Sequence, residues 1–582
     1  MQQEEDYFFK RYFVPFTTKK AVVFIAIIGF LVFANMLINS FAWDDLSYIL
    51  YNPEIHTLDI LSLFRPSFFN HGTQYRAFSA IYFALLHSVF TDKAFFYHFA
   101  QLTLHITNTV LLFVFLQKFF KKNISFVLSI LFLIHPIQVE SVSFIGATVS
   151  PLFFFFGITT LLIVSSKKLL GKAYSYGLVF LLLLLCLLTK ETGAGFVVGT
   201  AGFVYLFERK FFWKILSTTF ATTLLYIFIR FFIGGVGLTE KNVRAVTPII
   251  HLPFIERVLN IPAVFFYYLK TLFFPVSLAI DQVWVVKAID YQNFYFPLLA
   301  DIVFLLAIAW LGTVLFKRKK YMALYVFFLL WFVAGISIHL QLLPLDMTVA
   351  DRWFYFPYVG LLGLLGIALT ILPKKILRKR ILLTVTVIIL ILLSCRSIVR
   401  NANWHDDTTL LLHDIQVHSN YELENNLASF LLYQRRFPES LVHAKRSVEL
   451  YVYDKNLTNL GFIYEQLKDN NNAEMNYRKA ISLYNMPTRN DAAISRAYLR
   501  LSGIYLFNGN PKVAEQILKE ATGRYPANGI LWAFLAQAQY DQKKQEEALV
   551  SAKKAKKYLP SPATNALYEL IQTKKNVDVR TL

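Results

Sequence analysis

The sequence predicts an all-α protein in which a polytopic membrane unit precedes an α-solenoid of short repeats. The first observation is composition, because 56% of the 582 residues are hydrophobic, 17% are aromatic and the mean hydropathy is +0.48. Soluble globular proteins of this size rarely reach such values. The second is a change after Arg400, where long apolar runs stop and a repeat of about 34 residues begins. We therefore place a membrane domain at 1–400 and a repeat domain at 401–582.

Long apolar runs in the sequence predict the helices of the membrane unit. A spanning helix needs about 20 mostly apolar residues, with about 17 as a lower bound, and tilt or flanking side chains can accommodate a shorter run. We expect about eleven transmembrane helices, at 21–39, 95–117, 124–138, 146–165, 174–189, 193–207, 214–236, 297–316, 321–341, 354–372 and 380–397. The aromatic run at 258–280 contains Lys270 and two prolines. We expect that run to be interfacial or re-entrant.

Basic clusters fix the orientation, because Lys and Arg concentrate in cytoplasmic loops. With a cytoplasmic N-terminus and eleven spans, every cluster is cytoplasmic, whereas a twelfth span at 258–280 would place the last two outside. The clusters are Lys10/Arg11/Lys19/Lys20, Lys118/Lys121/Lys122, Lys167/Lys168/Lys172, Arg209/Lys210/Lys214, Lys317–Lys320 and Lys374–Arg380. The net charge of +21 therefore follows membrane topology rather than a nucleic-acid groove, and we expect membrane lipid and no nucleic acid as partner.

Repeats fill the polar C-terminal third. Each expected copy is a pair of helices with small residues at the crossing, which is the tetratricopeptide pattern. The copies are marked by Leu427-Ala428, Leu460-Gly461, Leu501-Ser502 and Leu535-Ala536. Since each repeat needs a neighbour to bury its apolar face, three or four copies predict a short solenoid. Parity places it outside the cytoplasm, and the composition favours a bacterial inner membrane over the endoplasmic reticulum.

Ionisable residues collect on the outer face of this topology. At the edge of a bilayer such residues are costly unless they are paired, solvated or functional, so their accumulation predicts a site. They are Asp44, Asp45, Arg76, His135, Glu140, Lys190, Glu191, Arg230, Asp351 and Arg352. Structural alternatives remain open: Asp44 and Asp45 could cap a helix, His135 could end one, and Lys190 and Arg352 could reach lipid headgroups.

Several motifs follow one another along nearly the whole chain. They read "WDD…NP" at 43–53, "YR" at 75–76, "FYHFAQLTLH" at 96–105, "LFLIHPIQVESVSFI" at 131–145, "LTKET" at 188–192, "DRWFYFPYVGLL" at 351–362 and "RNANWHDDTTLL" at 400–411. Their order and spacing resemble the transmembrane and tetratricopeptide-repeat-containing O-mannosyltransferases and their bacterial relatives. Two stretches depart from that pattern: "YRA" stands where relatives tend to have Arg-Pro, and "GATVSP" where they usually carry an Arg and an acidic residue.

The resemblance implies a C-type glycosyltransferase fold. It implies a polyprenyl-phosphate sugar, of dolichyl or undecaprenyl type, as donor and a protein hydroxyl as acceptor, with the repeats engaging the acceptor protein. A lipid phosphate departs readily as an anion, so one carboxylate suffices as general base while cations steady the phosphate. A single displacement of this kind inverts the anomeric centre.

Residue roles follow from that chemistry. We expect Asp44 and Asp45 to be catalytic, with Asp44 favoured as the base and its neighbour anchoring the loop; either carboxylate could instead hold a divalent cation. Arg352, Lys190 and Arg230 suit phosphate, since Arg binds it with two parallel bonds and Lys supplies a point charge. The other expected substrate contacts are Arg76, Glu140, His135, Asp351 and Glu191.

Two other functions fit the same sequence. A membrane-anchored tetratricopeptide scaffold would bind partners without catalysis. A transporter of lipid-linked sugars would carry polar residues at mid-membrane and show internal symmetry. The charges here cluster at one face, which favours the enzyme over the transporter.

Overall fold

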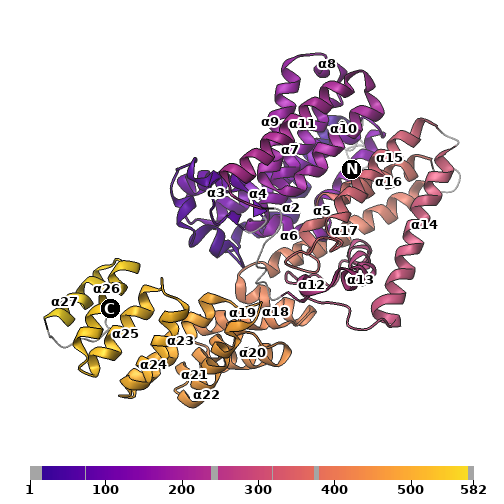
Figure 1. Cartoon of the computed structure of the whole chain (residues 1–582). Coiled ribbons are helices and arrows are strands. Elements are labelled where there is room, and N and C mark those ends of the chain that lie inside the picture. The colour runs from indigo at the N-terminus through magenta and orange to yellow at the C-terminus, as the bar shows by residue number, and fades with distance from the viewer. Residues whose placement is uncertain (1–15, 72–73, 238–246, 317–318, 372–378, 574–582) are drawn as a thin grey trace, which may run out of the picture. The chain divides into compact units, whose positions relative to one another are not determined.

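A computed structural model describes residues 16–71, 74–237, 247–316, 319–371 and 379–573, and the chain divides into two compact units (Figure 1). Among the described residues, the first unit extends to Val417 and the second begins at His418. The basic clusters at Lys10–Arg11, Lys317–Arg318 and Lys374–Arg378 lie outside the described residues. Both units are almost entirely helical, which confirms the all-α class.

Long apolar helices build the first unit, and each of the eleven apolar runs overlaps one of them. These helices are α2 (Thr18–Phe33), α4 (Ala94–Leu116), α5 (Lys122–Ile134), α7 (Val149–Val164), α9 (Tyr174–Thr189), α10 (Ala194–Phe207), α11 (Phe212–Phe228), α13 (Phe254–Phe273), α14 (Phe296–Phe316), α15 (Lys319–Ser337), α16 (Pro357–Ile371) and α17 (Lys379–Asn403). The helix α18 (Asp407–Val417) completes this unit.

Six of the described helices are long and apolar enough to cross a membrane, judged by length and composition. A seventh span results if α5 and the helices from Pro136 to Ser143 count as one broken span, bent by 52°. The bend falls at Pro136, which has no N–H to continue the α5 ladder. Five further apolar helices of the described residues are shorter: four correspond to α9, α10, α15 and α16, and the fifth is Ala77–Phe90. The expected eleven helices are therefore present, whereas eleven spans and their orientation remain predictions.

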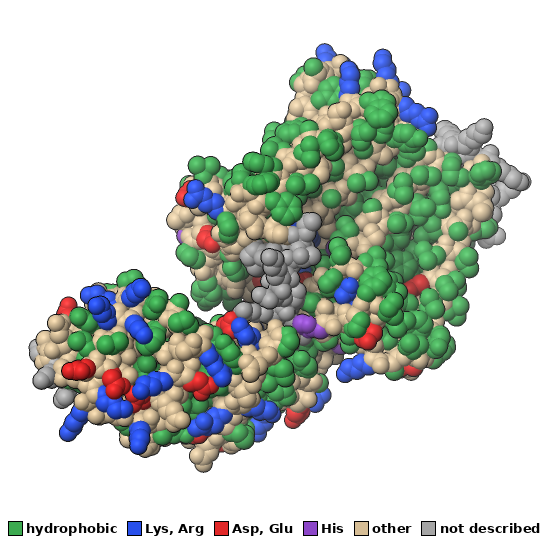
Figure 2. All heavy atoms as spheres, in the orientation of Figure 1, with side chains coloured by type: hydrophobic (Ala, Val, Ile, Leu, Met, Phe, Trp, Pro, Cys, Tyr) green, Lys and Arg blue, Asp and Glu red, His purple; other side chains and the backbone are tan. Residues whose placement is uncertain are grey.

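Exposed apolar side chains cover much of the first unit in the view of Figure 2, with Lys and Arg at its upper end near α8 (Lys167–Leu170). On α14, for example, Val303, Leu306 and Trp310 are all more than half exposed. The second unit shows a mixed charged surface in the same view. Contiguous apolar surface of this kind indicates contact with lipid or another apolar partner.

The 258–280 segment forms one helix rather than a re-entrant pair. Helix α13 buries Asn260, Val264 and Tyr268 at i, i+4 and i+8, which marks a single inward face. It is not among the helices that qualify as spans. An interfacial position fits this amphipathic pattern, while the paired, re-entrant alternative does not fit the continuous helix.

Short elements join the long helices and carry the expected site residues. They are η1 (Ala34–Ile38), η2 (Leu46–Leu50), η3 (Pro53–His56), η4 (Ser62–Phe64), β1 (Asn70–His71), β2 (Gln74–Tyr75), α3 (Ala77–Phe90), η5 (Pro136–Gln138), α6 (Val139–Ser143), η6 (Ile145–Thr148), η7 (Glu191–Gly193), η8 (Arg209–Phe211), η9 (Ile229–Ile233), α12 (Pro248–His251), η10 (Tyr291–Tyr295) and η11 (Asp351–Phe354). Strands β1 and β2 pair antiparallel, with Asn70 opposite Tyr75.

Aromatic rings fill the core between the long helices. Phe196 of α10 packs edge-on against Trp331 of α15, with ring centroids 5.4 Å apart, and against Phe356 at 4.9 Å. Such pairs add to the energy of burial. The ring of Phe196 fits against α7 because residue 157 is Gly, where a Cβ would lie 2.1 Å from it. This packed core positions the ends of the helices, where the site lies.

The second unit is a run of antiparallel helix pairs. Its helices are α19 (Tyr421–Tyr433), α20 (Phe437–Leu450), α21 (Asp454–Gln466), α22 (Asn470–Ser482), η12 (Leu483–Asn485), α23 (Asp491–Phe507), α24 (Pro511–Arg524), α25 (Gly529–Asp541), α26 (Gln545–Tyr558) and α27 (Pro562–Gln572). Small residues allow the close crossings: a Cβ on Gly461 would lie 2.7 Å from the ring of Tyr477, and the Ser440 hydroxyl donates to the Ala428 carbonyl at 2.6 Å. The four expected repeats correspond to the four pairs from α19 to α26.

Candidate functional site

The adjacent carboxylates of Asp44 and Asp45 lie in different surroundings. Asp45 is buried, and its two oxygens accept the N–H groups of Gly146 at 2.6 Å and Ala42 at 3.1 Å. Burial raises the pKa of Asp45 well above its ordinary value, while these two N–H donors oppose the rise. Asp45 therefore anchors its loop to the segment before α7. Asp44 is exposed, so it is the carboxylate of the pair that a substrate can reach.

The residue before this pair is held in an unusual backbone conformation. Trp43 has φ of 60°, in the left-handed region that non-glycine residues rarely adopt. Its N–H donates to Oδ1 of Asp407 at 2.5 Å. Burial raises the pKa of Asp407 to about 7, and the Trp43 N–H opposes that rise. The "NWHDD" motif thus supports the loop that presents Asp44.

Arg352 and Glu140 form a buried ion pair. The guanidinium of Arg352 contacts Oε1 of Glu140, and its backbone N–H donates to Oε2 at 3.1 Å. The Glu140 side chain is 2% exposed and that of Arg352 16%. The same guanidinium lies over the ring of Phe144, 5.9 Å from its centroid. These contacts join α6 to η11 and leave part of the Arg352 side chain accessible.

Lys190 is a buried cation at the end of α9. Its Nζ donates to the Ser150 hydroxyl at 3.0 Å, and no carboxylate of the described residues lies within ion-pair distance of it. Burial, with the charges of Arg76 and Arg352, lowers the pKa of Lys190 to about 7, and the charges of Glu191 and Glu140 oppose this fall. A buried ammonium without a counter-charge is expensive unless an anion binds beside it.

Glu191 lies close to the other two arginines of the site, Arg76 and Arg230. Its Oε1 accepts the Tyr75 N–H at 2.6 Å and lies 3.7 Å from Nη1 of Arg230, and its Oε2 lies 3.8 Å from Nε of Arg76. Arg230 is buried and donates to the hydroxyl of Tyr226 at 3.0 Å. Glu191 therefore connects β2, η7 and η9, and it balances part of the positive charge around Lys190.

His135 and Asp351 have structural partners. The ring of His135 donates from Nε2 to the Leu272 carbonyl at 2.9 Å and accepts the Ile137 N–H on Nδ1 at 3.1 Å, so both nitrogens are used within the protein. Asp351 is buried and accepts the hydroxyl of Tyr267 at 2.8 Å. Burial raises the pKa of Asp351 to about 8, and the charge of Glu140 adds to the rise. Neither residue offers the open charge expected of a substrate contact.

A small pocket joins the two central cations. Lys190 and Arg352 line it together with His339, and Phe153 and Trp353 form its apolar walls. Its cavity volume is about 10 Å³, which is room for about one water molecule, so a phosphate would enter only after the lining side chains move. The charge of Asp44 acts on Arg352, as the charge of Arg352 acts on Lys190. The exposed carboxylate of Asp44 is thus within electrostatic range of Arg352.

The sequence did not predict three residues that lie beside the site. Ser150 holds Lys190, and His339 stacks on Trp353 with centroids 5.0 Å apart. Tyr48 donates its N–H to the Asp44 carbonyl at 2.8 Å, one helical turn away. The i, i+4 spacing of Asp44 and Tyr48 was a visible signal, whereas nothing local marked Ser150 or His339.

Either carboxylate could hold a cation by its chemistry, and the geometry disfavours Asp45. Both oxygens of Asp45 accept backbone N–H groups, whose positive ends face the position that a cation would take. Asp45 is also buried, away from the exposed side chain of Asp44. We therefore assign no metal to Asp45.

Comparisons with known proteins identify the repeats. The tetratricopeptide repeat family model matches residues 455–485 and 495–528, which cover the pairs α21–α22 and α23–α24. Among solved structures, the chain is similar to one titled "Crystal Structure of P58(IPK) TPR Domain at 2.5 A", with 11% identity over 72% of this chain and 97% of that chain. The TM-score is 0.20, so this likeness carries no structural argument. No curated protein matches the chain. Tetratricopeptide repeats are thus confirmed for two of the four expected copies, and the matched residues lie in the second unit.

Proposed function

We propose that the membrane unit is a glycosyltransferase, of the O-mannosyltransferase kind, that uses a polyprenyl-phosphate sugar and modifies a protein hydroxyl at the extracytoplasmic face. One observation carries the proposal: buried Lys190 and half-buried Arg352 line one pocket, and the charge of the exposed Asp44 acts on Arg352. The resemblance of the motifs supports the same activity. A lipid phosphate needs cations as it leaves, and an attacking hydroxyl needs a base.

The chemistry is a single displacement. Asp44 takes the proton of the acceptor hydroxyl, whose oxygen attacks the anomeric carbon of the sugar. The bond from that carbon to the phosphate oxygen breaks, and the polyprenyl phosphate leaves with the electron pair. Lys190 and Arg352 stabilise the charge that develops on this phosphate. The proton on Asp44 then passes to solvent, and the configuration at the anomeric carbon is inverted.

The repeats provide the second candidate function. Tetratricopeptide solenoids generally present extended concave surfaces to protein partners, so a protein is the expected partner of this unit. In the enzyme, that partner is the acceptor. The family match is equally consistent with a membrane-anchored scaffold that binds proteins without catalysis, and it favours that alternative more directly than the enzyme.

Donor turnover distinguishes the two. Full-length protein in liposomes is given polyprenyl-phosphate sugars and an acceptor protein, and release of polyprenyl phosphate is followed. We expect the wild type to release it and Lys190→Met to lose the release. The control is Asp59→Asn, which changes an exposed carboxylate in the segment after Asp44 that accepts the Ser62 N–H. Capture of proteins by the repeats with no consumption of any donor would favour the scaffold.

Topology is part of the proposal. The N-terminus is cytoplasmic and the repeats lie outside, in a bacterial inner membrane rather than the endoplasmic reticulum. A cysteine introduced at Lys543, in the turn between α25 and α26, should react with a membrane-impermeant maleimide added to intact cells or spheroplasts. Labelling only after the membrane is opened would overturn the orientation.

A further inference from the structure

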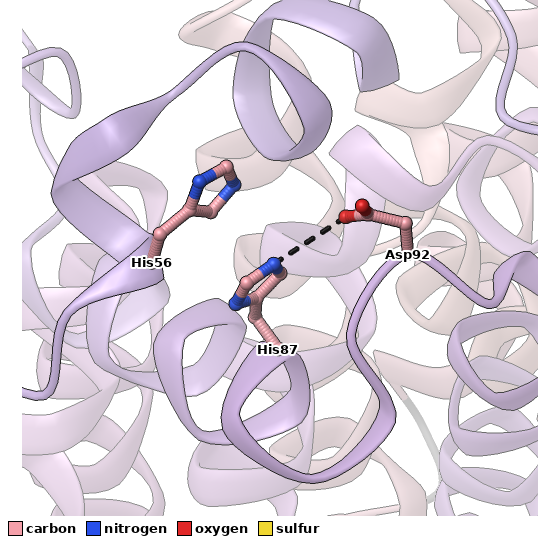
Figure 3. Close-up of side chains that lie close together, drawn as sticks. All are labelled: His56, His87 and Asp92. Carbon is pink, nitrogen blue, oxygen red and sulfur yellow. Dashed lines mark ion pairs between the residues drawn. The ribbon is translucent and has the colours of Figure 1, made fainter.

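We propose that His56, His87 and Asp92 form a transition-metal site, with Zn²⁺ as the ion that their donors fit best. One donor atom of each residue lies within 4.8 Å of the others (Figure 3). None of the three takes part in the contacts around Asp44 and Lys190. The proposal therefore does not depend on the proposed glycosyl transfer.

Three separate segments bring these donors together. His56 ends η3, His87 lies in the last turn of α3, and Asp92 lies in the turn before α4. Two imidazoles and one carboxylate are a common zinc donor set, with water in the remaining position of an open site. Calcium and magnesium prefer oxygen donors alone, so the two imidazoles argue against them.

Hydrogen bonding sets the tautomer of His56. Its Nε2 lies 2.8 Å from the Ile49 carbonyl oxygen. Because a carbonyl only accepts, Nε2 carries the proton and Nδ1 retains the lone pair of a neutral ring. A metal-bound histidine usually donates its other ring N–H to a carbonyl or carboxylate in this way. The contact with Ile49 thus prepares His56 as a ligand.

His87 lies between the other two residues. Its Nε2 is 3.3 Å from Oδ1 of Asp92, the ion pair drawn in Figure 3, and its ring stacks on that of His56 with centroids 4.1 Å apart. These rings are within 15° of parallel, so they do not yet direct two lone pairs at one point. Donors around a tetrahedral zinc ion lie about 3.3 Å apart.

Binding therefore requires rotation of side chains rather than of backbone. His56 and Asp92 are exposed and His87 is half-buried, so each has room to turn about its side-chain torsions. A shift of about 1 Å toward a common centre brings the donors to coordination distance. The ion would then tie η3 to the α3–α4 turn and, through Ile49, steady η2, which follows Asp44 in the chain.

Metal titration of the full-length protein tests the site. The protein is purified in detergent through a tag without histidine, stripped with chelator and titrated with Zn²⁺ by calorimetry. We expect one saturable equivalent in the wild type, and an affinity reduced by more than about tenfold in His56→Ala and His87→Ala. The matched control His251→Ala removes an exposed histidine on α12 and should bind as the wild type does.

A second readout identifies the ligands. Co²⁺ in place of Zn²⁺ should give visible absorption of a four- or five-coordinate ion in the wild type, and His56→Ala should lose it. His56→Ala also removes the bond to Ile49 and the ring contact with His87, so we expect only a small fall of its metal-free thermal midpoint. Loss of the Co²⁺ absorption with such a small fall separates lost ligation from misfolding. Absence of saturable Zn²⁺ binding in the wild type, or wild-type affinity in His56→Ala and His87→Ala, would overturn the proposal.

Discussion

Substituting Lys190 by Met should stabilise the protein while it removes donor binding. Lys190 is 7% exposed, and no carboxylate of the described residues lies within ion-pair distance of its ammonium. Its pKa falls from 10.5 to about 7, which corresponds to a preference of about 5 kcal/mol for the neutral amine. Met fills a similar volume without charge. It cannot donate the hydrogen bond that Lys190 makes to the Ser150 hydroxyl, and that bond is worth about 1 kcal/mol.

The pH dependence of this effect has a definite sign. Between the folded pKa of about 7 and the unfolded value of 10.5, the unfolded chain binds more protons than the folded protein. The contribution of Lys190 to the free energy of unfolding therefore rises with pH in that window, and the full penalty applies below it. Lys190→Met should exceed the wild type in stability by several kcal/mol near pH 6, and the difference should shrink toward pH 10.

Thermal unfolding in detergent, followed by intrinsic fluorescence at several pH values, measures this difference. Comparing the two proteins at each pH cancels the titration of all other groups. For the donor, the reasoning predicts an affinity that is constant below pH 7 and falls above it, because phosphate favours the protonated amine. A Lys190→Met protein that is less stable than the wild type at every pH would refute the account of a buried, uncompensated charge.

Two further substitutions test other contacts. Glu140→Gln leaves the guanidinium of Arg352 without its counter-charge and should lower the free energy of unfolding by about 3–5 kcal/mol, whereas the double variant with Arg352→Met should recover most of it. Gly461→Ala places a Cβ 2.7 Å from the ring of Tyr477 and should destabilise the repeats by about 1–3 kcal/mol. Its control Gly503→Ala meets nothing within 4 Å and should be neutral or stabilising by up to about 1 kcal/mol. Thermal unfolding checks both, and an equal effect of the two glycine variants would contradict the crossing argument.

Local patterns in the sequence were sufficient for the repeats and for the helices. The spacing of Gly461, Ala473 and Ala480 is a property of one helix pair, and these positions lie at the crossing because the α-helical period dictates it. Each of the eleven apolar runs likewise overlaps a helix of the structure. Their lengths did not settle the number of spans, since four of the helices are short for a bilayer and α5 is broken at Pro136.

The different roles of the site residues depend on contacts between residues that are distant in sequence. Asp45 is buried because Gly146, 101 residues away, donates to it, and no local rule distinguishes it from Asp44. The partners of Lys190 and Arg352 lie 40 and 212 residues away. Such pairings depend on electrostatics and on the packing of several helix ends. The sequence therefore predicted the charged residues of the site. It did not predict which of them pair within the protein and which are accessible.

The central claim is that Asp44 is the general base and Asp45 its anchor. The most direct measurement compares polyprenyl-phosphate release by Asp44→Asn and Asp45→Asn, with the thermal midpoint of each. Asp44→Asn should lose about 10²- to 10⁴-fold in rate and, because its side chain is exposed, should lower the midpoint less than Asp45→Asn does. Asp45→Asn should lower the midpoint, because an amide cannot accept both N–H groups equally well. Release at the wild-type rate by Asp44→Asn would contradict the account.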